Sequence, residues 1–516
     1  METVENIRDE DVELSLLKDL TLPFLKGNVF LPLKQQEDEL IAAVADSRGI
    51  YALRDLARNL KLKPHPLQAD ENIILDAINR IYSQASHVDE VMGDIKGEDL
   101  SMIATEFESP QDLLELTEDA PIIRLLNALL MEAVKEKASD IHIEPYEKGI
   151  DVRFRVDGIL NKVLTPPKII HDALVSRIKI IAGLDIAEKR LPQDGRIKLL
   201  VGGKNIDIRV SIIPTALGER AVLRLLDRQA GVLSLEKLGL TDTVLSSVKN
   251  ALSRQNGIIL VTGPTGSGKT TSLYASLLRL NTEDRNIITV EDPVEYQLSG
   301  VGQMQVNPKI GLTFASGLRS ILRQDPDIMM VGEIRDIETA EIAVHASLTG
   351  HLVLSTLHTN DAPGAITRLI DMGIEPFLVA SSLVCVLAQR LIRVICPHCK
   401  ESYKPSKQEL EYLKLDSFPF VLYHGKGCDK CLGKGYLGRT GIYELLKITP
   451  EIVKMIGERR DAKAIKAAAM KTGFKPLQDN AVEKILNGIT TMEEVLRITH
   501  NFKVMKTGQN DDEEIL

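Results

Sequence analysis

Residues 263–270 read GPTGSGKT and directly follow the apolar run 257–262. The pattern G-x-x-x-x-G-K-T provides backbone N–H groups that surround a phosphate chain, a lysine for the β- and γ-phosphates and a hydroxyl for Mg²⁺. A plain glycine-rich turn is the alternative, but every fixed position is met and a helical stretch follows. The pattern therefore predicts a nucleoside triphosphate site with Mg²⁺. Its expected contact residues are Gly263, Pro264, Thr265, Gly266, Ser267, Gly268, Lys269, Thr270 and Thr271.

A carboxylate follows the short apolar run 328–331. The run is succeeded by Gly332 and Glu333, so a glycine stands where a P-loop enzyme usually has the Asp that holds Mg²⁺. Glu333 is therefore expected to contact the metal shell or to polarise the attacking water. A solvated cap at the strand end is the alternative, but the P-loop earlier in the chain favours the catalytic role.

Three more carboxylates, Glu291, Asp292 and Glu295, follow the apolar run 287–290. Ligands of open parallel sheets bind at the carboxyl ends of the strands, which is where these side chains would lie. One of them is expected to position water or metal, and a turn with solvated acids is the alternative.

Histidines and arginines complete the set of candidate catalytic residues. His351 and His358 bracket the apolar run 352–355, where each can sense the γ-phosphate or bridge to Glu333, or can be a structural histidine. Arginines neutralise the charge that develops during phosphoryl transfer, although most arginines form surface ion pairs. The candidates are Arg209, Arg220, Arg224, Arg319 and Arg323.

Four of the five cysteines form two C-x-x-C pairs. Cys396 and Cys399 are separated from Cys428 and Cys431 by 28 residues, a longer gap than usual. Four thiolates in two such pairs still suit tetrahedral Zn²⁺ in a closed structural site, whereas disulfides are disfavoured in a cytosolic chain and a redox dithiol fits two pairs poorly. Cys385 lies in an apolar segment and is expected to be a small core residue.

A chain of 516 residues is too long for one core, so several domains are expected. Apolar runs alternate with helical stretches between 235 and 390, which predicts a mostly parallel sheet covered by helices. Before it, an amphipathic helix that begins at Pro121 and strands around 152–156 and 206–212 predict an α+β domain. The first 82 residues are expected to contain short helices, for example 38–46 and 51–60. The expected division is 1–83, an acidic linker 84–118, 119–230, an ATPase domain 235–500 with an insert at 396–437, and an acidic tail 501–516.

Charge is distributed unevenly along the chain. Residues 1–120 contain 11 Lys and Arg against 26 Asp and Glu, a balance of −15, and the total is −10. An acidic chain with 4% aromatic residues and no Trp lacks the basic surface and stacking platforms of a general nucleic-acid binder. The N-terminus has no apolar signal segment, and no apolar run is long enough for a membrane helix. We therefore expect a cytoplasmic protein, or one held at a membrane by a partner.

The combination of motifs resembles the secretion and pilus traffic ATPases, in particular the type II secretion ATPase of the GspE type. The resemblance covers about 119–498. The matching stretches, beside the four cysteines, are KRLPQDGRI at 189–197, GERAVLRLLD at 218–227, LVTGPTGSGKTTSLY at 260–274, ITVEDPVE at 288–295, LRQDPDIMMVGEIRD at 322–336 and TGHLVLSTLHTND at 349–361.

The resemblance implies an α/β, RecA-like P-loop ATPase core, a preceding PAS-like α+β domain, a small N-terminal domain and a zinc-binding insert. It further implies a homohexameric motor whose N-terminal domain docks on an inner-membrane platform protein and whose ATP hydrolysis drives pseudopilus assembly. By position, Glu333 is the catalytic glutamate, Glu295 the acidic-box carboxylate, and His351 and His358 the histidine-box residues. Arg209, Arg224, Arg319 and Arg323 correspond to arginines that face the phosphates.

Two alternatives stay open. A type IV pilus extension ATPase shares the motor core, but usually has a longer N-terminal region with repeated nucleotide-sensing motifs, which are not found in residues 1–118. A nucleotide-switched adaptor that does not hydrolyse ATP is a different class, and the presence of Glu333 and the arginines argues against it.

Overall fold

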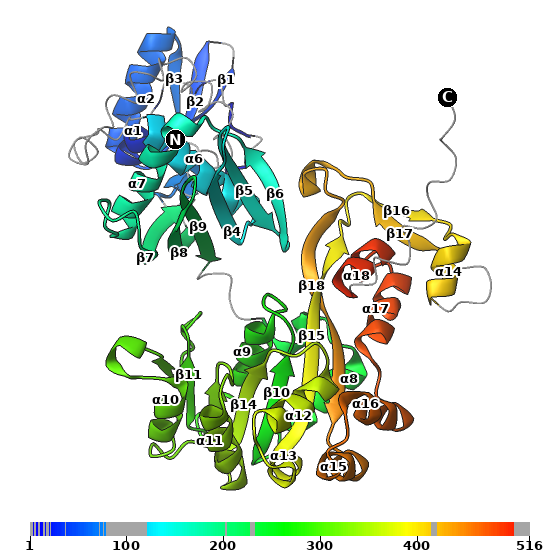
Figure 1. Cartoon of the computed structure of the whole chain (residues 1–516). Coiled ribbons are helices and arrows are strands. Elements are labelled where there is room, and N and C mark those ends of the chain that lie inside the picture. Colours follow the sequence, from blue (N-terminus) through cyan, green and yellow to red (C-terminus); the bar gives the residue numbers. More distant parts are fainter. Residues whose placement is uncertain are drawn as a thin grey trace. The chain divides into compact units, whose positions relative to one another are not determined.

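The computed structural model describes most of residues 22–71, scattered residues on either side of them between 4 and 78, and 121–201, 204–227, 233–413 and 421–499. The chain forms two compact units, Met1–Ala230 and Gly231–Leu516 (Figure 1). The linker expected at 84–118 and the tail at 501–516 lie outside the described residues. Among the described helices, none is both long and apolar enough to cross a membrane.

The N-terminal residues form a three-stranded sheet with helices. The elements are α1 (Leu22–Asn28), β1 (Phe30–Gln36), β2 (Glu39–Val44), α2 (Ser47–Leu60) and β3 (Lys63–Gln68). Strand β2 is central, antiparallel to β1 and parallel to β3. The side chain of Asp46 caps α2 by accepting N–H bonds from Arg48 and Gly49.

The helix expected at 38–46 is wrong, because these residues contain β2. Its sequence, ELIAAV, is a short apolar run of the kind that suits a buried strand or a helix equally well, and neighbouring strands on both sides decided the outcome. The helix expected at 51–60 is confirmed as part of α2. Pro64 and Pro66 lie in β3, which is an edge strand where a missing N–H is tolerated.

A six-stranded antiparallel sheet with two helices follows. The elements are α6 (Pro121–Lys135), β4 (Asp140–Pro145), β5 (Ile150–Val156), β6 (Ile159–Leu164), α7 (His171–Ala182), β7 (Gln193–Val201), β8 (Lys204–Thr215) and β9 (Gly218–Asp227). The strand order is β6-β5-β4-β9-β8-β7. Helices α6 and α7 share a core with one face of this sheet, to which β4 contributes Ile141 and Ile143. The alternate β4 residues Asp140, His142 and Glu144 lie on the opposite face.

The second unit is built on a seven-stranded sheet of order β12-β11-β13-β14-β10-β15-β18. All neighbours in this sheet are parallel except β15 and β18. The strands are β10 (Gly257–Thr262), β11 (Ile287–Glu291), β12 (Gly302–Gln305), β13 (Ile328–Val331), β14 (Leu352–Leu357), β15 (Leu383–Ile395) and β18 (Tyr436–Lys447). The expected α/β core with a mostly parallel sheet is therefore confirmed.

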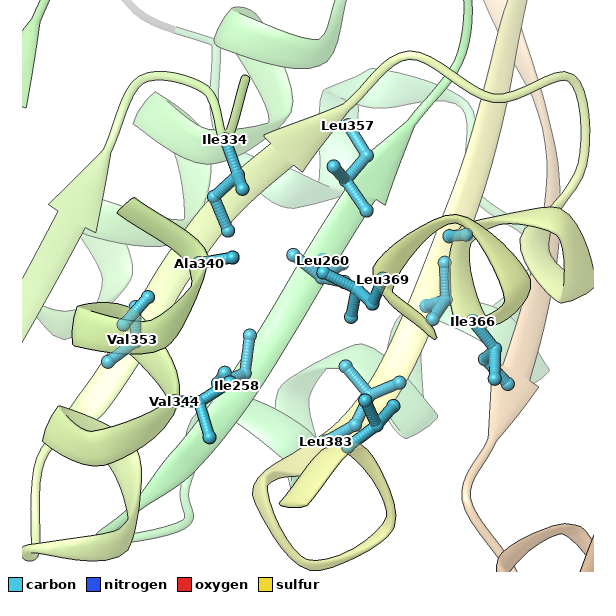
Figure 2. Close-up of a cluster of buried hydrophobic side chains, with 14 of the residues drawn as sticks. Ile258, Leu260, Ile334, Ala340, Val344, Val353, Leu357, Ile366, Leu369 and Leu383 are labelled. Atoms are coloured by element: carbon cyan, nitrogen blue, oxygen red, sulfur yellow. The ribbon is translucent and has the colours of Figure 1, made fainter. Parts of the chain in front are cut away.

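Helices cover both faces of this sheet. Ile259 and Val261 of β10 pack with α8 (Asp242–Leu252) and α9 (Lys269–Leu280). Ile258 and Leu260 point to the other face, where Figure 2 shows them among side chains of neighbouring strands and helices. The helices of that side are α10 (Phe314–Ile321), α11 (Ile337–Leu348), α12 (Ala362–Asp371), α13 (Pro376–Ser382), α15 (Pro450–Gly457) and α16 (Ala462–Lys471). Because successive residues of a strand face opposite sides, the continuous apolar run of β10 fills both cores.

An insert and two further helices complete the unit. They comprise β16 (Lys400–Tyr403), α14 (Lys407–Leu413), β17 (Leu422–Gly425), α17 (Leu477–Leu486) and α18 (Met492–Thr499). Glu494 anchors α18 to β15, because its fully buried carboxylate pairs with Arg393 at 2.8 Å and with Arg497 at 2.6 Å.

Candidate active site

The loop 263–268 joins the carboxyl end of β10 to the first residue of α9. Gly263, Gly266 and Gly268 have φ angles of 147°, 77° and 85°, which side-chain-bearing residues rarely adopt. A Cβ on Gly263 would also lie 2.4 Å from the carbonyl oxygen of Gln389. The glycines therefore permit a conformation in which the N-terminus of α9, with its unpaired N–H groups, faces the loop as an anion site.

Lys269 lies inside this loop. Its ammonium donates to the carbonyl oxygens of Gly263 at 2.8 Å and Pro264 at 3.1 Å. Burial lowers the pKa of Lys269 to about 8, Glu333 opposes this shift and Arg390 adds to it. The buried Oγ of Ser267 has no hydrogen-bond partner among the described residues, and the Thr270 side chain is exposed on the first turn of α9. These groups fit a triphosphate with Mg²⁺ at the hydroxyl.

The pKa of Lys269 predicts how nucleotide binding depends on pH. A bound triphosphate raises this pKa again, because nearby negative charge favours the ammonium. Affinity is therefore fully present below about pH 8 and is lost as the pH rises further, by about tenfold between pH 7 and pH 9. Titration with a fluorescent ATP analogue at constant Mg²⁺ measures the effect. Lys269→Arg stays charged and should show a flat profile; a flat profile for the parental chain would contradict the prediction.

Gln389 holds the loop from a neighbouring strand, and the sequence-based reasoning missed it. Its Nε2 donates to the carbonyl oxygen of Ser267 at 2.8 Å and its Oε1 accepts from Ser272 Oγ at 2.7 Å. The side chain is buried in the middle of β15, directly after Ala388, the last residue of β15 that pairs in parallel with β10. A glutamine directly after the apolar residues 383–388 was the only signal in the sequence.

Gln389→Leu is expected to weaken nucleotide binding by about tenfold and to lower the free energy of unfolding by about 1–3 kcal/mol, because it leaves buried polar groups of the loop and of α9 unpaired. Nucleotide titration and thermal unfolding measure the two effects. Asn480→Leu is the matched control, since Asn480 is a buried amide whose Oδ1 accepts from Tyr443 N at 3.0 Å. It should lose stability only; equal affinity losses would contradict the role of Gln389.

Glu333 lies at the carboxyl edge of the sheet, just beyond β13. Its carboxylate pairs with Arg335 and with Nε2 of His358 at 3.2 Å, and its side chain is 15% exposed. Glu333 acts on the pKa of Lys269, so the two charges are close. The hydrogen bond from Arg335 to Glu333 raises the pKa of Arg335, which sequence reasoning had not selected. The structure thus brings together Lys269, Glu333 and His358.

The carboxylates after β11 have different environments. Glu291 is buried and accepts hydrogen bonds from the hydroxyl groups of Tyr274 and Thr289 and from Gln303 Nε2. This environment is that of a structural carboxylate. Burial and the bond to Glu291 raise the pKa of Tyr274, whose hydroxyl accepts the Glu295 N–H at 3.1 Å. Tyr274 therefore connects α9 to the loop that carries Asp292 and Glu295.

The structure does not bring every predicted residue to this edge. His351 precedes β14 at its amino end, and its Nδ1 bonds the carbonyl oxygen of Ala346 at 2.9 Å. The six residues of β14, roughly 20 Å of strand, separate it from His358. Arg319 pairs with Glu338 in the first turn of α11, and Arg323 donates to the carbonyl oxygen of Arg319 at 3.0 Å.

Arg209 and Arg224 belong to the first compact unit, on β8 and β9. They lie directly opposite each other in the register of these strands. Their predicted contact with phosphates stays a prediction.

The four predicted metal ligands form one cluster between β15 and β18. The Sγ atoms of Cys396, Cys399, Cys428 and Cys431 all lie within 4.8 Å of one another, with pairs at 3.7, 3.8 and 3.9 Å. Zn–S bonds of about 2.3 Å in a tetrahedron give S···S distances near these values. All four cysteines are free thiols, and buried Cys385 is not part of the cluster. The site fits Zn²⁺.

Comparison with known proteins agrees with this geometry. Residues 115–497 match the model of the family described as type II/IV secretion system protein, and residues 3–88 match the MshEN domain. A type II secretion system protein E of Pseudomonas aeruginosa is 52% identical over 481 residues, which are 92% of this chain and 94% of the relative. A type IV pilus assembly ATPase, PilB, of Myxococcus xanthus is 45% identical over 500 residues, 95% of this chain and 88% of the relative.

A solved structure shows the same fold. The Legionella pneumophila ATPase DotB has a TM-score of 0.54 and 22% identity, and the match covers 73% of this chain and 95% of that one. The family match spans the P-loop, Glu333 and the four cysteines, and the relatives share nearly the full length of the chain. This chain therefore belongs to the type II/IV secretion system protein family and is a P-loop ATPase.

Proposed function

We propose that this chain is the motor that powers pseudopilus assembly and protein export by type II secretion. The observation that carries the proposal is the pairing of Glu333 with His358 beside the buried Lys269, since a bare nucleotide switch has no need of an oriented carboxylate there. The relative named type II secretion system protein E, similar over nearly its whole length, supports the secretion role.

The site residues divide the reaction among them. Lys269 and the N–H groups of the loop bind the triphosphate, and the Thr270 hydroxyl would hold Mg²⁺, which neutralises phosphate charge when bound. Glu333 polarises the attacking water, and His358 and Arg335 hold its carboxylate in place. Glu295 or Asp292 positions water from the neighbouring loop. Arg319 and Arg323, which are not brought to this edge within one chain, would stabilise the transition-state charge at the site of a neighbouring copy.

The work of the motor is domain movement. Arg209 and Arg224 of the middle domain are assigned to neutralising phosphate charge, and hydrolysis drives the movement of domains. Six copies form a ring in the cytoplasm, and residues 1–83 dock on an inner-membrane platform protein, which keeps the motor at the membrane. The insert at 396–437 binds structural Zn²⁺. The MshEN match within 3–88 supports a partner-binding role for the N-terminal domain.

Type IV pilus assembly is the second candidate, supported by the Myxococcus xanthus relative. Affinity purification of the tagged full-length chain from membranes of its source cells, with ATP-turnover measurement on the same sample, distinguishes the outcomes. A secretion platform protein among the retained proteins supports the proposal, and a pilus platform protein supports the second candidate. If the chain bound ATP but released no phosphate, with or without its platform protein, the proposal of an ATP-hydrolysing motor would be refuted. The result would indicate a nucleotide-switched adaptor.

A further inference from the structure

Tyr274 lies in the second turn of α9, the helix that begins with Lys269 of the P-loop. Its side chain is 1% exposed, and a tyrosine hydroxyl can donate one hydrogen bond and accept two. This hydroxyl donates to Glu291 and accepts the N–H groups of Glu295 at 3.1 Å and Tyr296 at 3.5 Å. The backbone of the loop after β11 is therefore fixed to α9 through one buried hydroxyl.

The side of α9 that carries Tyr274 also carries Thr270, because residues four positions apart lie on the same side of a helix. Helical side chains also lean toward the N-terminus of the helix, which here is the P-loop. Thr270 is exposed at that end, and its hydroxyl is the group that would hold Mg²⁺. The backbone of Glu295 is thus held on the side of α9 where the metal would bind, and this placement follows from the geometry of α9 alone.

The same loop also borders the Glu333 side of the site. Strands β11 and β13 are adjacent and parallel, so the residues that follow them leave the sheet at the same edge. The hydrogen bond with Glu333 raises the pKa of Arg335, and the charge of Asp292 adds to this shift, so Asp292 lies close to the ion pair. The loop that carries Asp292 and Glu295 therefore reaches both the Thr270 side of α9 and the carboxylate of Glu333.

We propose that Tyr274 is a positioning residue for ATP hydrolysis, which holds the loop so that the carboxylate of Glu295 reaches the attacking water. The proposal rests on the proposed function, in which Glu295 or Asp292 positions this water, and Glu295 is the one whose own N–H group Tyr274 holds. Tyr274 is buried and acts only through the loop. A carboxylate held in advance loses less conformational freedom when it orients water, and a small displacement of such a group is costly in rate.

A double-mutant cycle on the full-length chain tests the proposal. Tyr274→Phe keeps the ring and removes only the hydroxyl, and it is expected to lower kcat by about tenfold while the KM for ATP stays near the parental value. Glu295→Gln should lower kcat at least as much. The double variant should match Glu295→Gln alone, because the hydroxyl then has no catalytic carboxylate to position.

Tyr403→Phe is the matched control, since the Tyr403 hydroxyl also donates to a glutamate, Glu409, at 2.6 Å, but in the insert. It should lower the thermal midpoint and leave kcat within about twofold. A parental kcat for Tyr274→Phe, or losses that multiply in the double variant, would overturn the positioning role. A parental kcat for Glu295→Gln would instead refute the role of Glu295 in the proposed function, on which the positioning role depends.

Tyr274→Phe also leaves the buried carboxylate of Glu291 without one of its donors. If the variant does not fold for this reason, Glu291→Gln removes the buried charge and becomes the reference chain, since Glu291 is a structural carboxylate. Tyr274→Phe in the Glu291→Gln chain should then lower kcat by about tenfold relative to Glu291→Gln alone. An equal kcat in these two chains would overturn the proposal.

Discussion

Glu333→Gln is expected to bind ATP with nearly parental affinity and to lose turnover by about 100-fold or more. The amide keeps the size of the side chain but cannot take up a proton from the attacking water, and general-base catalysis is typically worth 10²–10⁴-fold. The two residues that pair with Glu333, Arg335 and His358, have no role in holding the phosphates in this assignment, so nucleotide binding depends on Lys269 and the loop. Phosphate release and fluorescent-nucleotide titration measure the two quantities separately.

Two controls sharpen this result. Glu341→Gln changes an exposed glutamate on the neighbouring helix α11, outside the site, and should keep parental turnover. Lys269→Ala should lose nucleotide binding itself, because it removes the ammonium from inside the loop. If Glu333→Gln kept parental turnover, the catalytic assignment of Glu333 would be wrong. Another carboxylate would then be the catalytic one, and Glu295 would be tested first.

Loss of the metal site is the second large effect. The purified chain is expected to contain stoichiometric zinc, and Cys399→Ser should lose it together with the folded insert around β16 and β17. Free energy of metal binding is folding free energy in small structural sites, of the order of 10 kcal/mol in zinc-finger peptides. Among the described residues, the apolar cluster at this site consists of the four cysteines themselves, so no other packing there replaces that contribution. Metal analysis and thermal unfolding with and without a chelator provide the measurement.

Cys385→Ala serves as the control for this experiment, since Cys385 is a buried free thiol outside the cluster. Burial raises the pKa of Cys385 to about 12, so it stays a thiol and no metal ligand. This variant should keep its zinc. If the parental chain contained no metal and all five thiols reacted freely with a thiol reagent under native conditions, structural zinc would be excluded.

Local patterns predicted the core strands well. The runs at 257–262, 287–290, 328–331 and 352–355 are β10, β11, β13 and β14 with small changes at their ends. These runs are continuous, short and bounded by turn residues, and helical stretches join them. This pattern is typical of the strands of a parallel sheet, which are buried on both faces. The same strength of pattern is absent in ELIAAV at 39–44, and there the predicted helix was wrong.

Residue spacing alone was sufficient for the P-loop and the four cysteines, because each depends on residues that are close in the chain or on a ligand set with a known geometry. The partners of Glu333 and the support of the loop were different. Arg335 and Gln389 were not selected from the sequence, and only the family resemblance, not the local pattern, favoured Glu295 over Glu291. What distinguishes them is burial and the identity of the atoms within hydrogen-bond distance.

Sequence order thus determined the chemistry that this chain carries: a P-loop, a carboxylate after the β13 run and a tetracysteine cluster. Only the tertiary structure decided which side chains support that chemistry, as the contact of Gln389 with Ser267 shows across 122 positions of the chain. The physical reason is that hydrogen bonds and ion pairs act over a few ångströms. The fold, and not the spacing along the chain, brings such atoms within that range.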